Sequence, residues 1–179
     1  MKKIDNLLLR RNNRVILWGS GVVTAAICGV MNLVLIPMIE KNTGGIRCFD
    51  MQSFGYSYET ALQFLAALGE SGRKIYLHMQ LPLDFIYPVA YTVFFVFLFA
   101  ALRKRVSKVL LLPLFMAVFD YAENICSICM LRSMAPSKNL AAFASCMTVA
   151  KSACLALTAI FSVIYLARLL ISRRKARRS

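Results

Sequence analysis

Residues 109–131 read VLLLPLFMAVFDYAENICSICML, an apolar run that contains two acids, Asp120 and Glu123. A helix rises about 1.5 Å per residue, so about 20 residues cross the roughly 30 Å of hydrocarbon in a bilayer. The run is long enough to span a membrane, although a carboxylate at its centre costs about 2.5–3.5 kcal/mol on insertion scales. We therefore predict a membrane-spanning helix whose two acids have polar partners.

Three other apolar runs predict further spans, at residues 15–39, 81–102 and 140–167. Hydrophobic residues make up 59% of the 179-residue chain despite a formal net charge of +14. A soluble nucleic-acid-binding protein spreads its charge over a polar surface, so this composition argues against nucleic acid as a partner. We predict an all-α fold, an integral membrane four-helix bundle, as a single membrane domain over residues 1–179.

The basic residues indicate how the bundle is oriented. Residues 1–14, 103–108 and 168–179 hold 15 of the 22 Lys and Arg residues, whereas residues 40–80 and 132–139 hold six. Because basic residues gather on the cytoplasmic side of membrane proteins, both termini are predicted to be cytoplasmic. Lys151 lies inside the fourth span, and this rule does not explain it.

The extracytoplasmic segment, residues 40–80, is the only sizeable predicted part outside the bilayer. Ser57 is placed to cap a short amphipathic helix, and Gly69 is placed to end it. A second helix is predicted to start at Ser71 or Gly72 and to run through Arg73 into the second span. The amphipathic helix either lies on the membrane surface or covers the mouth of the bundle as a lid. The sequence leaves both interpretations open.

Polar side chains recur at helical spacing in each span, as expected for an inward-facing polar core. Lys151 lies about 16 Å below Leu140, and Asp120 and Glu123 lie about 18 and 13 Å below Arg132, at 1.5 Å per residue. These depths coincide, so we predict that Lys151 pairs with one of the two acids. The predicted ligand pocket consists of Asn32, Asp84, Tyr87, Tyr91, Asp120, Glu123, Asn124 and Lys151.

A pocket of this kind suits a protein that binds or moves a lipid or small amphiphile, which is the leading functional hypothesis. The alternative is an intramembrane enzyme with Asp120 or Glu123 as catalytic acid or base. In that case Asp84, Asp120 and Glu123 are the candidate ligands of a divalent cation, and no other cofactor is predicted. Membrane lipids and a small amphiphile are the expected partners, and a homo-oligomer is left open.

Cysteine supplies a third hypothesis, because Cys126 and Cys129 form a C-x-x-C motif near the outer end of the third span. In this respect the chain is similar to vitamin K epoxide reductase and the bacterial disulfide-forming membrane enzymes. It departs from them in having one loop cysteine, Cys48, where they have a shuttle pair. A thiol–disulfide oxidoreductase is therefore the lesser alternative.

Several short motifs between residues 50 and 130 can be taken together. They are Gly55-Tyr56-Ser57, Leu68-Gly69, Gly72-Arg73 with Tyr76, Asp84 with Pro88 and Tyr91, and Asp120 with Glu123-Asn124. The pattern resembles a group of small bacterial four-helix integral membrane proteins of uncharacterised function, with a lid-like segment after the first span. The resemblance implies a bacterial cytoplasmic (inner) membrane location and a shared polar core at the Asp and Glu-Asn positions. It implies no activity, substrate or cofactor.

Overall fold

The structure is a computed structural model that describes residues 13–103, 108–133 and 135–176. Basic residues at positions 1–12, 104–107 and 177–179, which contribute to the predicted orientation, lie outside the described residues. In chain order the helical elements are α2 (Asn13–Val30), η1 (Met31–Leu35), α3 (Ile36–Asn42), η2 (Phe49–Met51), α4 (Tyr58–Ile75), η3 (Tyr76–Gln80), α5 (Leu81–Arg103), η4 (Lys108–Leu110), α6 (Leu111–Arg132) and α7 (Lys138–Ala176). The described part of the chain contains no strand, so the predicted all-α class is confirmed.

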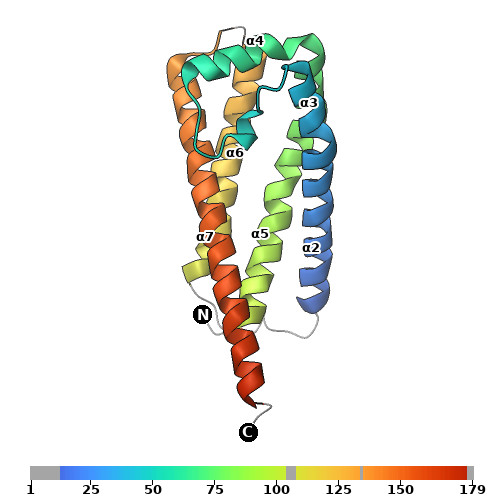
Figure 1. Cartoon of the computed structure of the whole chain (residues 1–179), viewed down its shortest axis with the longest axis vertical. Helices are drawn as coiled ribbons and strands as arrows, with labels where there is room; N and C mark the ends of the chain where they lie inside the picture. The colour runs from blue at the N-terminus through green and yellow to red at the C-terminus, as the bar shows by residue number, and fades with distance from the viewer. Residues whose placement is uncertain (1–12, 104–107, 134, 177–179) are drawn as a thin grey trace.

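Four helical runs are long and apolar enough to cross a membrane: Asn13–Asn42, Tyr58–Leu102, Lys108–Arg132 and Lys138–Arg174. Each contains one predicted span and extends beyond it. In the bundle, α2 packs mainly on α5, and α6 packs mainly on α7. The start of α2 and the end of α7 lie at the same end of the bundle, and α4 lies across the opposite end (Figure 1).

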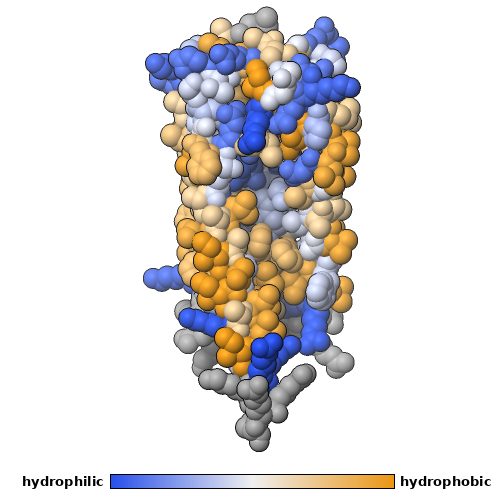
Figure 2. Space-filling view, in the orientation of Figure 1, coloured by the Kyte–Doolittle hydropathy of each residue, from blue (hydrophilic) through white to orange (hydrophobic). Residues whose placement is uncertain are grey.

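The outer surface of the bundle is largely apolar, the reverse of a water-soluble helical bundle. Trp18 and Leu33 on the first run are 72% and 79% exposed, and Val118 on α6 is 60% exposed. Hydrophobic residues cover the flanks in Figure 2, and hydrophilic residues gather toward the two ends. Exposed apolar patches this extensive mark a surface that meets another apolar phase or a partner.

The helix predicted after Ser57 is present, and its predicted interruption at Gly69 is confirmed. The Ser57 hydroxyl caps α4 by accepting a hydrogen bond from the backbone N–H of Thr60 at 3.1 Å. Gly69 has a φ of 62° and kinks the helix, which then continues through η3 into α5 without a loop. A glycine takes this left-handed conformation without the steric cost that a side chain would add, so one helical segment ends here and the second predicted segment follows directly.

The loop between α3 and α4 folds inward beneath α4 (Figure 1). Phe49, in η2, is fully buried, and its ring centroid lies 4.7 Å from that of Phe64 and 5.0 Å from that of Tyr56. Gly55 passes so close to α7 that an added Cβ would lie 2.8 Å from Ser145 Oγ. We call residues 43–57 the inner loop; aromatic packing and close contact with α7 fix its position.

Candidate functional site

Lys151 of α7 is at the centre of a buried charge cluster. Its Nζ lies 3.1 Å from Asp120 Oδ1 and 3.2 Å from Asp50 Oδ1, and it also pairs with Glu123 Oε2. The side chains of Asp120 and Glu123 are 3% and 0% exposed. The predicted pairing of Lys151 with the acids of the third span is therefore confirmed, and the inner loop contributes a third acid.

The second oxygen of each of these carboxylates accepts a hydrogen bond from a hydroxyl group. Tyr91 donates to Asp120 Oδ2 at 3.0 Å, and Thr148 donates to Glu123 Oε1 at 2.6 Å. Tyr76 donates to Asp50 Oδ2 at 3.2 Å. A buried ion pair is tolerated when its remaining lone pairs have donors, so these hydroxyl groups complete the cluster.

A cavity of about 360 Å³ adjoins this cluster. Its polar lining residues include Asp50, Gln80, Asp84, Asp120 and Lys151. The rest is mainly apolar or aromatic, and its larger side chains are Met31, Ile36, Met51, Tyr87, Tyr91, Phe94, Phe95, Met116 and Leu155. This volume lies within the usual range for small-molecule sites, and the wall has the mixed composition of a site for an amphiphilic molecule.

Asp84 and Gln80 in the cavity wall have buried polar atoms without partners among the described residues, as does Thr24. Asp84 is 3% exposed, and its Oδ2 has no hydrogen-bond partner among the described residues. Gln80 is fully buried at the end of the π-helical turn η3, and neither its Oε1 nor its Nε2 has a partner there. Unsatisfied buried polar atoms are rare and costly, so this pair requires an explanation.

The structure separates the predicted pocket residues into two groups. Asn32, Asp84, Tyr87, Tyr91, Asp120 and Lys151 line the cavity. Glu123 lies behind it and holds Lys151. The Asn124 side chain donates to the backbone carbonyl of Asp84 at 2.9 Å, so it positions α5 against α6 rather than facing the cavity wall.

The predicted metal ligands are also regrouped. Carboxylate oxygens of Asp50, Asp120 and Glu123 lie within 4.8 Å of one another, whereas Asp84 is not in this group. The ammonium group of Lys151 contacts all three carboxylates and takes the position that a bound cation would need. The cluster therefore contains its own cation, and Asp120 and Glu123 are both engaged with it.

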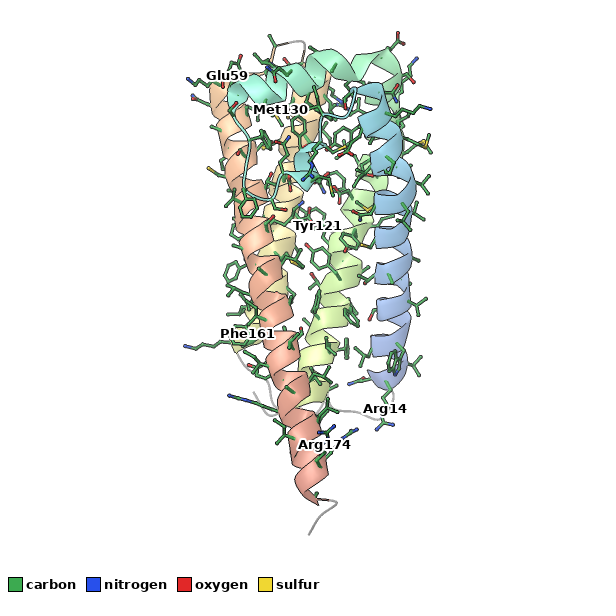
Figure 3. The ribbon with its side chains drawn as sticks, in the orientation of Figure 1. Arg14, Glu59, Tyr121, Met130, Phe161 and Arg174 are labelled. Carbon is green, nitrogen blue, oxygen red and sulfur yellow. The ribbon has the colours of Figure 1, made fainter. Side chains whose placement is uncertain are left out.

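Sequence reasoning missed Asp50, Gln80, Thr148 and Tyr76 as parts of the site. Asp50 lies between Phe49 and Met51, two apolar residues in a loop predicted to be outside the bilayer. That local pattern was the available signal, because an apolar pair in a polar loop favours burial of the segment. The site lies toward the α4 end of the bundle. In Figure 3, Tyr121, the neighbour of Asp120, is nearer to Glu59 than to Arg14 or Arg174.

Comparisons of this chain with protein families, with curated proteins and with solved structures gave no match. This outcome is consistent with the uncharacterised family that the sequence motifs resemble. A functional conclusion therefore depends on the cavity and the charge cluster.

All six cysteines are free in the structure. Cys126 is buried beside Met130 and Leu131 in the hydrophobic core under α4, whereas Cys129 is exposed. Burial, with the Asp50 and Glu40 carboxylates nearby, raises the pKa of the Cys48 thiol. A reactive cysteine pair needs accessible thiolates. The buried thiols of Cys126 and Cys48 are therefore better suited to a packing role.

Proposed function

We propose that the chain is a multi-pass protein of the bacterial cytoplasmic membrane, with both termini in the cytoplasm. Four apolar helical runs of sufficient length and the exposed apolar side chains along them support this proposal. The excess of basic residues in segments 1–14, 103–108 and 168–179 of the sequence, 15 against six in segments 40–80 and 132–139, supports the orientation. Of these residues, Arg14 and Arg174 lie toward the end opposite α4 (Figure 3).

We further propose that the cavity binds a lipid or small amphiphile, which the protein holds or moves. The observation that carries this proposal is the composition of the wall, since charged groups and aromatic and aliphatic groups line the same cavity. An amphiphile combines the same two kinds of group, a polar head and an apolar tail. Burial of the tail contributes about 25 cal/mol per Å² of apolar surface.

Access to such a cavity is proposed to involve the inner loop and the face between α2 and α7. Asp50, Met51 and Ser53 of the inner loop form part of the wall, so movement of this loop would open the cavity at the α4 end. The face between α2 and α7 is hollowed, with paler and polar residues visible between orange flanks (Figure 2). An amphiphile entering from the bilayer would pass along this face.

The binding proposal is tested by filling the cavity from α7. Ser152 is half-buried in the cavity wall, and a Ser152→Phe substitution places a ring in the space that the tail would occupy. We expect native mass spectrometry in mild detergent to detect an amphiphile bound to the wild-type protein and at least about tenfold less on the variant, equivalent to about 1.4 kcal/mol.

Ala153→Phe is the matched control, since Ala153 is the next residue of the same helix and its side chain is exposed. This variant should retain the amphiphile at the wild-type level. Equal occupancy in all three proteins would mean that the bound molecule lies on the outer surface, and the cavity proposal would be lost. Thermal unfolding of both variants shows whether a loss of ligand reflects a loss of fold.

A further inference from the structure

The hydrogen bonding of the charge cluster separates Asp84 from the other acids. Asp50, Asp120 and Glu123 each use one carboxylate oxygen for Lys151 and the other for a hydroxyl donor. Every carboxylate oxygen of this cluster therefore already has a partner. Asp84 lines the same cavity, and its buried Oδ2 accepts nothing from the described residues.

Gln80 lies one helical turn before Asp84, and it is a second side chain with polar atoms that lack hydrogen-bond partners. Both of its side-chain polar atoms are buried and without partners among the described residues, and both residues line the cavity. Residues four apart lie on the same helix face, so the two side chains can contact one small group. Two acceptors and one donor are thus available at this position: Asp84 Oδ2, Gln80 Oε1 and Gln80 Nε2.

The charge of the surroundings selects the kind of head group. Asp50, Asp120 and Glu123 share the single ammonium group of Lys151, and Asp84 in the cavity wall is a fourth carboxyl group with no ion pair among the described residues. A carboxylate, sulfate or phosphate head would add to this negative charge. A head group that carries positive charge and several N–H donors would offset it and satisfy the open acceptors.

We infer that the cavity binds an amphiphile with a primary ammonium head group, held by Asp84 and Gln80. The aromatic side chains of Tyr87, Tyr91 and Phe94 line the same cavity and can contact the cation or the start of its chain. The cavity volume of about 360 Å³ is at the lower end of the range for small-molecule sites, which suits one head group with a single chain. This inference rests on the proposed amphiphile-binding function and specifies its ligand.

The test compares three probes with the same chain: dodecylamine, dodecanol and dodecanoate. Binding to the full-length protein in a nonionic detergent is measured by native mass spectrometry at a series of probe concentrations. We expect dodecylamine to bind at least about tenfold more tightly than either of the other probes, which corresponds to about 1.4 kcal/mol. Asp84→Asn should weaken dodecylamine binding by a similar factor and leave dodecanol binding unchanged.

Glu70→Gln is the matched control, because Glu70 is an exposed acid of α4 that pairs with Lys74 and does not line the cavity. Gln80→Leu provides a second variant that removes open polar groups rather than a charge. This variant should raise the midpoint of thermal unfolding without ligand and weaken dodecylamine binding. It keeps the inference testable should Asp84→Asn fail to fold.

Competition distinguishes a bilayer lipid from a free amine as the source of the ammonium group. Nanodiscs with ethanolamine phospholipids that displace dodecylamine, where choline phospholipids do not, would identify a lipid with a primary amine. If neither phospholipid displaces dodecylamine, the source of the ammonium group is a single-chain amine. Displacement by both equally would overturn the inference, because a quaternary ammonium group has no N–H donor.

Two failures have different meanings. If the three probes bind equally well and Ser152→Phe abolishes the binding of all of them, the ammonium inference is wrong and the cavity still binds amphiphiles. If Ser152→Phe affects none of them, the proposed function itself is wrong. Unchanged dodecylamine binding in both Asp84→Asn and Gln80→Leu would likewise overturn the inference.

Discussion

Lys151→Met is expected to lower the free energy of unfolding by about 3–5 kcal/mol. The substitution keeps most of the apolar stem but leaves Asp50, Asp120 and Glu123 together without their shared cation. Loss of one partner from a buried ion pair is strongly destabilising, because the remaining charge is neither solvated nor paired. A denaturant titration of the protein in detergent micelles measures the change.

A rescue variant separates charge from packing in this prediction. Adding Asp120→Asn and Glu123→Gln to Lys151→Met removes two of the unpaired charges and should recover a large part of the lost stability. Lys138→Met, at the exposed start of the same helix, is the matched control and should change stability by less than about 0.5 kcal/mol. A Lys151→Met protein as stable as the control would show that the ion pairs of Lys151 make no net contribution to the free energy of unfolding.

Phe49→Ala is expected to release the inner loop from the bundle. The Phe49 ring is fully buried against Phe64 and Tyr56, and truncation of a buried Phe costs about 3–5 kcal/mol. Cys48 reports the release, because its thiol is fully buried and its pKa is raised by burial and by nearby carboxylates. A loss of about 3 kcal/mol from loop closure should speed alkylation of Cys48 by about 100-fold, at about 1.4 kcal/mol per factor of ten.

The pH dependence of this alkylation has a definite sign. The thiolate is the nucleophile, so a raised pKa keeps wild-type Cys48 protonated and slow to react at neutral pH. Once the loop is released, the pKa of Cys48 falls toward the usual value of a free cysteine. The increase of the alkylation rate with pH then begins at a lower pH than in the wild-type protein. Site-specific peptide mass spectrometry follows Cys48 separately from the exposed Cys129 and Cys146.

Phe54→Ala is the control for the loop variant. Phe54 belongs to the same loop, but its side chain is 100% exposed, so its truncation removes no internal packing. Alkylation of Cys48 should stay at the wild-type rate in this variant. Equal acceleration in both variants would indicate that the loop is loosely held and that the aromatic cluster around Phe49 does not anchor it.

The sequence allowed the helical bundle and part of the site to be predicted, because both follow from local patterns. Apolar runs of sufficient length set the four long helices, and rise per residue placed Lys151 at the level of Asp120 and Glu123. Both arguments use only distances along single helices. The structure bears them out in the helical runs and in the ion pairs of Lys151.

The site residues that could not be predicted from the sequence depend on contacts that no local pattern specifies. Asp50 reaches Lys151, 101 positions away, because the inner loop folds back beneath α4. That Asp84 and Gln80 lack hydrogen-bond partners becomes clear only when the positions of the polar groups on neighbouring helices are known.

A crystal structure of the protein grown from a lipidic mesophase would test most directly whether the cavity is a ligand site. We predict elongated non-protein density in the cavity, with its polar end within hydrogen-bond distance of Asp84 or Gln80 and its tail beside Phe94 and Phe95. The contrary result is a cavity closed by side chains, with Asp84 and Gln80 bonded to protein groups and no density between α2 and α7.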